Sequence, residues 1–505
     1  MKTYNKLFIL VVLIVFSGCN DAIDIDQPGR LPTEEAFKNL ADLQDGLTGL
    51  YGLYDTTSEI QFNAVFTDEV SIGFDSGGQG IGNGEYGFVL NPNSAAANTI
   101  WASNYAVINF ANRIIEASEI ITVETGEQED VNHILGQAYA LRAYSHFQIQ
   151  SYFTTDYTDD TALGGILLDF IPEIDVDTDQ SRPRSTNGAV FGLITADLDL
   201  AENLLAIESD PIYVSQDFVT ALRARMAAYR SQYAQADTYA AELLAKYPIA
   251  DRSEYEAMYL DEDNTEIIFK LERTLSDNYN GQGSTGSGFA GGWAGANFAF
   301  IDATITGSPY FEMGRSVFNL INSEDIRFDV NIDGTSIISD DYQNAADYRN
   351  EDILVISKYP GSEGQPLMND LKVFRSSEML FIRAEAAAST GNINGNTNST
   401  AAYIKQLRDA RFGEDQSLPS YASQTEAFGA ILDERRIELV FEGHRYKDLK
   451  RLGALGNRGI SRDPLDCEVN GACSLEVSDY RFTNPIPIIE LTPNTVIDEQ
   501  QNPGY

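Results

Sequence analysis

The chain has 505 residues and a formal net charge of −42 at pH 7, because 76 Asp and Glu residues outnumber 34 Lys and Arg residues. A field of this sign repels nucleic acid and acidic lipid surfaces, which argues against a DNA- or RNA-binding role. Aromatic residues make up 11% of the chain, so it is not a disordered acidic tail.

The N-terminus has the layout of a secretory signal peptide. Two early lysines precede an unbroken apolar run at residues 7–16, which is too short to anchor the chain across a bilayer. Cys19 follows two small residues directly, as the cysteine of a lipobox does. We therefore predict that residues 1–18 are removed and that Cys19 carries the lipid anchor. The alternative is an ordinary cleaved signal with an incidental cysteine.

Helical patterns follow along most of the chain. Thr33 is placed to cap a helix over residues 34–54, and a glycine-rich irregular stretch is expected over 58–98. Apolar spacing then predicts further helices over 99–119, 130–153, 187–206, 215–230, 235–246, 377–390 and 400–412, and another from about residue 425.

The two helices at 215–230 and 235–246 are predicted to form a hairpin with a seam of small residues. The seam pairs Ala221, Ala224 and Ala228 with Ala236, Ala240 and Leu243. Small residues let helices pack closely, as in the helical hairpins of tetratricopeptide arrays. Residues 251–372 differ, since short apolar runs, turns and glycines predict a long irregular insertion there.

Only two cysteines follow Cys19. Cys467 and Cys473 lie in one loop-like stretch with five residues between them. In an exported protein this pattern favours a disulfide over two free thiols. The three histidines are scattered, so no metal site is predicted.

Motifs of the common enzyme classes are absent. Residues 281–286 match G-x-G-x-x-G, but glycines and Trp293 follow where a dinucleotide site needs a helix. There is no G-x-S-x-G elbow and no H-E-x-x-H zinc motif. No cofactor is predicted. A surface glycoside hydrolase with an unrecognised carboxylate pair stays open as an alternative.

Residues 430–452 read AILDERRIELVFEGHRYKDLKRL. Glu434, Glu438 and Glu442 form an acidic row at i, i+4 spacing beside Arg435 and Arg436, which predicts ion pairing along the helix. This stretch resembles the signature of the SusD/RagB family of outer-membrane nutrient-binding lipoproteins from Bacteroidetes. One departure is Tyr446, where Trp or Phe is common in the family.

Other segments resemble the family in the same order along the chain. They are TIWASNYAVINFANRIIE, which includes Trp101 and Tyr105, GQAYALRAYSHFQIQSYF, RSTNGAVFGLITADLDLAENLL, MLFIRAEAAASTGN and the ending QNPGY. With the lipobox, the resemblance covers nearly the whole mature chain.

The resemblance implies a single SusD-like domain over residues 19–505. Its fold would be mainly α, with tetratricopeptide-like helix pairs and a long irregular insertion. It also implies a lipid-anchored protein at the outer-membrane surface, with a SusC-like TonB-dependent transporter as partner. Such a protein is not an enzyme. It captures an oligosaccharide, or in some members a peptide, and hands it on.

The family places its ligand site on loops, which here correspond to residues 71–92 and 277–310. The aromatic candidates are Phe74, Tyr86 and Phe88 in the first loop, and Tyr279, Phe289, Trp293 and Phe298 in the second. Aromatic planes stack on the C–H faces of sugar rings. Trp293 is the first candidate because glycines flank it, whereas Trp101 lies in a family helix and is expected in the core.

Overall fold

The computed structural model describes residues 33–74, 77–172, 181–205, 210–274, 311–366 and 368–505. Among these residues helices dominate, and strands occur only as short two-stranded pairs. The prediction of a mainly α fold is therefore confirmed.

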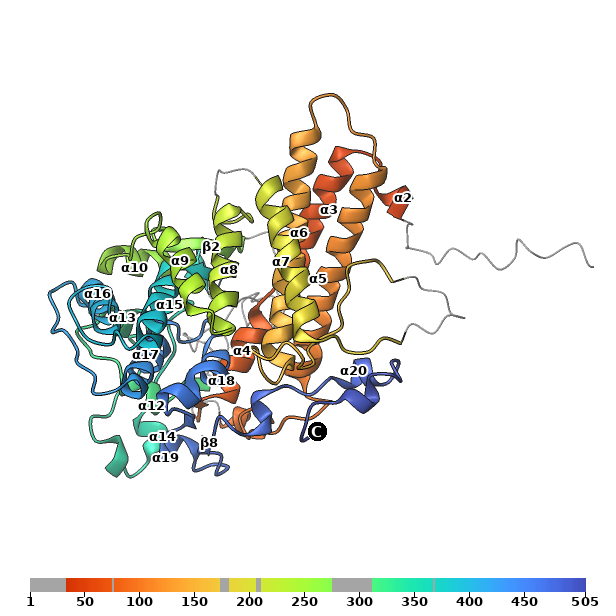
Figure 1. Cartoon of the computed structure of the whole chain (residues 1–505). Coiled ribbons are helices and arrows are strands. Elements are labelled where there is room, and N and C mark those ends of the chain that lie inside the picture. Colours follow the sequence, from red (N-terminus) through yellow and green to blue (C-terminus); the bar gives the residue numbers. More distant parts are fainter. Residues whose placement is uncertain (1–32, 75–76, 173–180, 206–209, 275–310, 367) are drawn as a thin grey trace, which may run out of the picture.

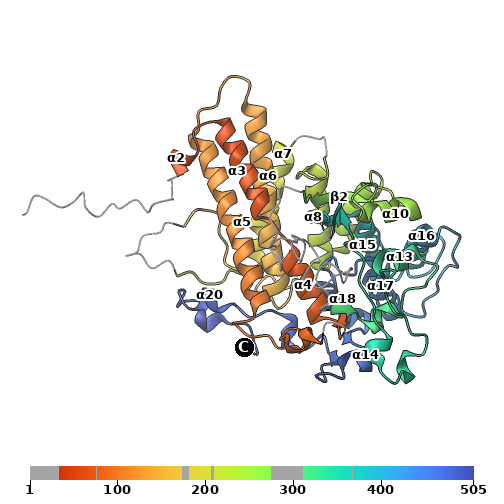
Figure 2. The same ribbon diagram turned by 180° about the vertical axis from the view of Figure 1, so that it is seen from behind.

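The first group of helices is an upright bundle (Figures 1 and 2). It contains α3 (Leu40–Leu53), α5 (Ala95–Ile120), α6 (Gln128–Phe153) and α7 (Asn187–Leu204). Helix α6 packs against α3, α5 and α7, so it is the central helix of the bundle. Nearly every side chain in its second half is buried, in keeping with that position.

The second group contains two helix pairs. Helix α8 (Gln216–Tyr229) packs against α9 (Tyr233–Leu244), and α15 (Ser376–Ser389) packs against α16 (Thr400–Phe412). All six residues of the predicted alanine-rich seam are buried. Helix α15 also packs against α9, so the two pairs form one layered unit although about 130 residues separate them in the sequence.

Two further helices close this group. Helix α17 (Gln424–Glu438) packs against α18 (Arg445–Gly456), and α18 also contacts α4 (Thr57–Phe66) near the start of the chain. The remaining helical elements are α2 (Thr33–Ala36), η1 (Gln79–Gly82), α10 (Arg252–Tyr259), α12 (Arg315–Phe318), α13 (Ile326–Asn331), η2 (Tyr342–Asn344), α14 (Tyr348–Glu351), α19 (Pro464–Cys467), η3 (Tyr480–Phe482), α20 (Ile488–Leu491) and η4 (Asp498–Gln500).

Two local predictions near the N-terminus were wrong. Asn39, not Thr33, caps the long helix: its Oδ1 accepts from the backbone N–H groups of Ala41 and Asp42, and the Asp42 carboxylate accepts from Asn39 N. This capping box starts α3 afresh at Leu40. Helix α4 occupies part of the stretch expected to be irregular. It is buried on nearly every side, which removes the apolar stripe that reveals a helix in a sequence.

Within the described ranges, four antiparallel strand pairs accompany the helices. The longest joins β2 (Ile267–Leu271) to β6 (Leu371–Arg375), and a shorter one joins β1 (Val70–Ile72) to β3 (Phe311–Met313). The other two pairs are β4 (Gly361–Ser362) with β5 (Gln365–Pro366) and β7 (Ile460–Ser461) with β8 (Ser474–Leu475).

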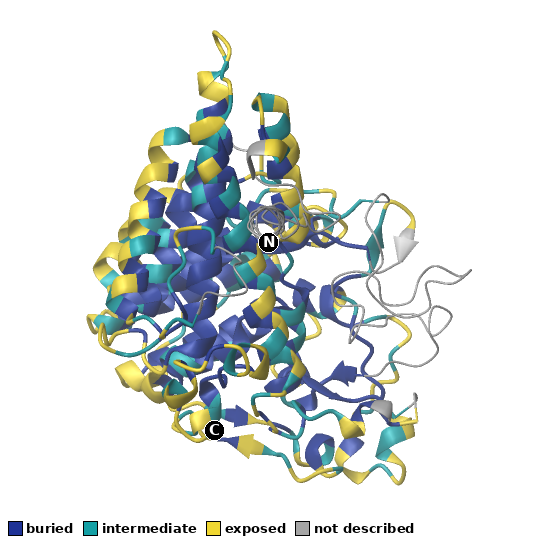
Figure 3. Cartoon of the chain, turned by 90° about the vertical axis from the view of Figure 1, so that its right-hand side faces the viewer, coloured by how far each residue is buried: buried dark blue, intermediate teal, exposed yellow. Residues whose placement is uncertain are grey.

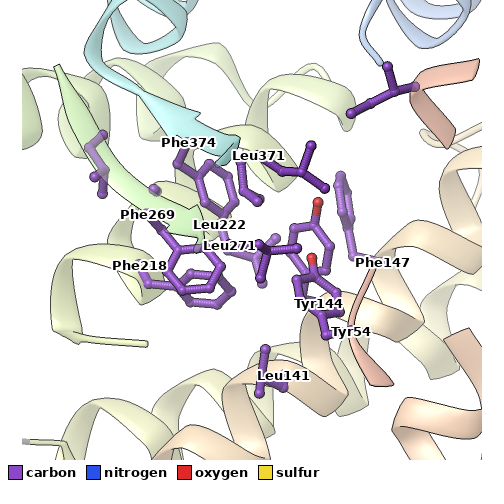
Figure 4. Packing of buried hydrophobic residues seen from close by; sticks show 14 of the residues in the cluster. Tyr54, Leu141, Tyr144, Phe147, Phe218, Leu222, Phe269, Leu271, Leu371 and Phe374 are labelled. Atoms are coloured by element: carbon purple, nitrogen blue, oxygen red, sulfur yellow. The ribbon is translucent and has the colours of Figure 1, made fainter. Parts of the chain in front are cut away.

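The core lies where the β2–β6 pair meets the helices (Figure 4). The Phe218 ring of α8 lies 4.9 Å from the Phe269 ring and 5.3 Å from the Phe374 ring, both nearly edge-on. Such aromatic pairs add to the energy of burial. They attach the segment predicted as an insertion, residues 251–372, to the helical scaffold. Buried residues follow the inner faces of the helices (Figure 3).

The acidic row of the signature segment pairs across the fold rather than along its own helix, contrary to the prediction. Glu438 Oε1 accepts from Arg375 Nη1 at 3.0 Å and from Arg411 Nη2 at 2.8 Å. Arg435 instead binds Asp448 at 2.7 Å. Glu438 ends α17, so its carboxylate faces other elements.

We call this buried cluster the ionic junction, and it consists of Glu266, Arg327, Lys358, Arg375, Arg411, Glu438 and Glu442. Burial alone would raise the pKa of Glu438. The guanidinium groups of Arg411 and Arg375 outweigh burial and hold that pKa well below its usual range. The junction therefore joins the residue before β2 to β6, α13, α16 and α17 through charge-assisted hydrogen bonds.

None of the helices formed by the described residues has the length and apolar character needed to cross a membrane.

Candidate ligand-binding site

The β1–β3 pair brings the start of the first predicted ligand loop next to Phe311, the residue that follows the second. Ile72 is paired with Phe311 in the antiparallel register, so the first loop leaves β1 at the end where the second loop enters β3. The sequence placed these loops more than 180 positions apart, and only the strand pairing joins them. Tyr279, Phe289, Trp293 and Phe298 lie outside the described residues.

Tyr86 and Phe88 support the first loop from inside. Tyr86 is fully buried, its hydroxyl donates to Asp466 O at 2.9 Å, and the Arg462 guanidinium lies 3.9 Å from its ring centroid. Arg462 also covers the Phe88 ring at 4.4 Å. Tyr86 therefore offers no open ring face, contrary to its predicted role as a stacking residue. The sequence could not show that Arg462, far along the chain, lies against it.

Arg462 clamps the loop to the scaffold. Its guanidinium donates to the backbone carbonyls of Val65, Thr67, Tyr86 and Ala472. Burial lowers the pKa of Arg462, and the carbonyl oxygens replace the water that a buried cation loses. The base of the loop is therefore held in a fixed position.

Phe74 is the predicted aromatic that reaches the surface. Its ring is half-buried, and the Arg349 guanidinium of α14 lies 4.1 Å from its centroid. Arg349 Nη2 lies 3.7 Å from the Glu468 carboxylate, and both side chains are exposed, Arg349 by 41% and Glu468 by 67%. We call Phe74, Tyr348, Arg349 and Glu468 the Phe74 face. It combines an aromatic ring with planar hydrogen-bonding groups.

Sequence reasoning missed Tyr348 and Arg349. They lie in the segment described only as irregular, and the one available signal was the pair Tyr342 and Tyr348 in a polar run. Their rings lie 6.2 Å apart, and the Arg315 guanidinium covers Tyr342 at 4.1 Å. Aromatic residues without regular spacing give no indication of which face they occupy.

Asp466 ties this face to α19. Its carboxylate accepts from Tyr348 Oη at 2.6 Å and from Arg315 N at 2.8 Å. Burial raises the pKa of Asp466 to about 7, because few charges of opposite sign compensate it. The next residue, Cys467, forms a disulfide with Cys473, with their Cα atoms 5.0 Å apart. This is the pairing that the sequence favoured.

Comparison with known proteins decides the family. Residues 256–505 match the model of the SusD family, and residues 24–230 match a model described as "Starch-binding associating with outer membrane". The chain belongs to the SusD family. This is a family of carbohydrate-binding proteins associated with the outer membrane. The resemblance predicted from the sequence is confirmed.

Two relatives of this SusD-family protein come from Formosa agariphila. SusD-like protein P2 is 26% identical, with all of both chains covered, and SusD-like protein P38 is 24% identical, with 89% of this chain and 92% of the relative covered. A SusD superfamily protein from Bacteroides thetaiotaomicron has a similar structure, with a TM-score of 0.74 at 22% identity, covering 92% of this chain and all of that one. A laminarin-binding SusD-like protein reaches 0.66 at 21% identity, covering 93% and 100%. At these identities the structural likeness shows the fold.

Two residues of the family motifs lie in the core of this SusD-family protein. Trp101 is buried, as predicted, and its indole Nε1 donates to Glu490 at 3.2 Å. Tyr446 is fully buried and stacks on Phe482 and Tyr152 with interplanar angles of 17° and 16°. Tyr446 thus keeps the aromatic packing expected where the family commonly has Trp or Phe.

Proposed function

We propose that this protein captures an oligosaccharide at the cell surface and delivers it to a SusC-like TonB-dependent outer-membrane transporter. Removal of residues 1–18 would leave Cys19 as the acylated first residue and hold the protein at the outer membrane. The protein acts by binding and does not cleave its ligand. The observation that carries the proposal is the β1–β3 pairing, because it gives two aromatic loops a common base beside the Phe74 face.

The chemistry of the Phe74 face suits a sugar. The Phe74 ring supplies an apolar edge, and Arg349 and Glu468 supply donors and acceptors for hydroxyl groups. We place Trp293 in the same site as a stacking platform, with Tyr279 and Phe298 as further contacts. The family description and the laminarin-binding structural relative support a glycan over a peptide.

Laminarin is the first probe, chosen from the named relative. Isothermal titration with the mature chain lacking the lipid measures the affinity, and chromatography of the recovered glycan shows whether it is intact. We expect binding to an intact glycan. Shortened glycan would overturn the non-catalytic proposal. If laminarin does not bind, a panel of plant and algal glycans is titrated next, and binding only to peptides would replace the glycan proposal with the peptide alternative.

Two variants test the site. Trp293→Ala should weaken glycan binding about tenfold to a hundredfold, since stacking and its buried area contribute about 1–3 kcal/mol. Phe74→Ala should weaken it by a smaller factor, because the ring is half-buried. Tyr213→Ala removes an exposed aromatic that belongs to neither loop in the sequence and is the matched control. Equal affinities in all three variants would remove the site from these loops.

The anchor and the partner need their own test. Cys19→Ala should release the protein from the outer-membrane fraction or leave its signal uncleaved, whereas Cys19 of the natural chain should carry acyl groups in mass spectrometry. Detergent extraction of the natural chain should recover a large β-barrel transporter in the same complex. An unmodified mature N-terminus would contradict the anchor, and recovery of the chain alone would contradict the partner.

A further inference from the structure

A pocket lies between α5 and α20, away from the Phe74 face. Its volume is about 330 Å³. Its walls come from α5, from the segment after α6, and from the C-terminal tail, and we call it the α5–α20 pocket. The lining residues used below are Trp101, Tyr105, Asn109, Arg182, Glu490 and Asn494. Helices α20 and α14 lie well apart along the lower part of the molecule in both views (Figures 1 and 2).

One wall is a stripe on α5. Trp101, Tyr105 and Asn109 recur every four residues, so their side chains line the same side of the helix. The two rings lie 4.8 Å apart at 52°, and Ile166 and Leu168 extend the apolar surface beside them. At the end of the stripe, Asn109 Oδ1 is buried and has no hydrogen-bond partner among the described residues. A buried amide oxygen without a donor is costly. Because solvent does not reach this oxygen, a ligand hydroxyl donates to it only after the Asn109 side chain turns toward the pocket.

The opposite wall is polar and firmly held. Asn494 bonds both backbone groups of Arg182, accepting from its N–H at 3.2 Å and donating to its carbonyl at 2.8 Å. The Glu490 carboxylate accepts from Trp101 Nε1 and from Asn494 Nδ2, at 3.2 and 2.7 Å. These bonds join three distant segments and fix the shape of the pocket.

Arg182 supplies donors to the pocket. Its guanidinium lies over the Phe170 ring at 4.5 Å, and within the described ranges it forms no ion pair. Its planar fork of N–H groups has the geometry to bind ligand oxygens.

We propose that the α5–α20 pocket binds a single sugar ring. The combination of aromatic edges, an amide side chain and a guanidinium group fits a compact polyhydroxylated ring better than an apolar ligand, which has no hydroxyl to donate to Asn109. The pocket volume is near the lower end of the roughly 300–1,000 Å³ of ligand sites, so it suits one ring rather than an extended chain. This inference goes beyond the proposed function, because it concerns a different part of the molecule.

The test uses five methyl pyranosides (gluco, galacto, manno, xylo and rhamno) and saturation-transfer NMR on the mature chain. Weak binding with a dissociation constant in the millimolar range is expected for at least one of them. Ala102 is exposed and lines the pocket, so Ala102→Trp should fill it and abolish the signal. Ala106→Trp places the same ring on the same helix outside the lining and should keep the signal. Asn109→Ala should weaken binding several-fold.

The outcomes separate this inference from the proposed function. Loss of signal in Ala102→Trp, with retention in Ala106→Trp and Phe74→Ala, supports the pocket. Loss in Phe74→Ala with retention in Ala102→Trp overturns the pocket and places monosaccharide binding at the Phe74 face. Absence of transfer from all five glycosides also overturns it, whatever the result with polymeric glycans. Melting curves of each variant ensure that a lost signal does not come from unfolding.

Discussion

The alanine-rich seam and the ionic junction are equally buried, yet they hold the fold together in different ways. The seam joins α8 to α9, which are neighbours in the sequence, through apolar side chains such as Ala224 and Ala240. The junction collects charged groups from Glu266 to Glu442, which approach only in the folded protein. The seam gains energy from close packing. In the junction each charge is stabilised only while its partners are present, since desolvation opposes every one of them.

Because the seam is held by apolar packing and the junction by paired charges, the two regions tolerate different substitutions. A packed apolar seam resists added volume, and the penalty grows with the number of atoms inserted. A buried ionic cluster resists the loss of a single partner, because the charges that remain are then uncompensated. The Phe74 face is a third case, where we expect changes to alter ligand binding and hardly the stability of the fold.

The largest expected effect comes from breaking the junction. Glu438→Gln removes a carboxylate that compensates Arg375 and Arg411, so the free energy of unfolding should fall by about 3–5 kcal/mol. Chemical denaturation of the mature chain measures it. Asp415→Asn makes the same chemical change in an exposed ion pair with Lys405 and should cost less than about 1 kcal/mol. Equal losses in both variants would refute the stated role of the junction.

The next effect is a pH dependence from Asp466. Its pKa in the folded protein is about 7, above the value of about 3.9 in an unfolded chain. Between these values the folded state keeps a proton that the unfolded state releases. The stabilisation is therefore complete below about pH 4 and is lost as the pH rises through about 7. Asp466→Asn cannot titrate.

The difference in unfolding free energy between the natural chain and Asp466→Asn should change in favour of the variant from pH 4 to pH 8. Taking the difference cancels the other titrating groups. A constant difference over this range would show that the folded and unfolded pKa values of Asp466 are alike.

A moderate effect is expected from overpacking the seam. Ala240 of α9 is fully buried. Ala240→Leu adds three carbon atoms there and should lower the free energy of unfolding by about 1–3 kcal/mol. Ala234→Leu makes the same change at an exposed position of α9 and should be within about 0.5 kcal/mol of the natural chain. Thermal unfolding of both variants tests this. A neutral Ala240→Leu would mean that the helices can separate without loss.

The smallest effect on stability belongs to the Phe74 face. Arg349→Ala should change the unfolding free energy by less than about 1 kcal/mol, because its ion pair with Glu468 is exposed. Glycan affinity should nevertheless fall about tenfold, through loss of charge-assisted hydrogen bonds. Arg458→Ala removes a comparably exposed arginine paired with Asp433, and should leave binding unchanged. A large loss of stability in Arg349→Ala would assign Arg349 to the fold instead of the ligand.

Local patterns predicted the long helices well, because an amphipathic stripe or a seam of small residues can be recognised within one short segment of the sequence. Helices α5 to α9 and α15 to α17 lie within a few residues of their predicted positions. Helix α4 was missed because a helix buried on all sides has no polar stripe. The cap at Asn39 was misplaced because Thr33 and Asn39 both carry capping side chains, and the reciprocal bond from Asp42 decides between them.

The candidate site was predictable only as two loops. Phe74 and Tyr86 looked alike in the sequence, as aromatics among glycines. The fold separates them, since Arg462 covers the buried Tyr86 while Arg349 lies over a half-exposed Phe74. Both arginines lie hundreds of positions away, and no local rule connects them to the loop.

The sequence by itself determined the family, the mainly helical fold and the pairing of Cys467 with Cys473, because those depend on motifs, periodicity and short spacing. The tertiary structure alone decided the partners of Glu438, the burial of Tyr86, the pairing of β1 with β3, and the α5–α20 pocket. These depend on contacts between residues far apart in the chain. Hydrogen bonds and ion pairs act over a few ångströms in space, and only the folded path of the backbone decides which side chains come within that distance.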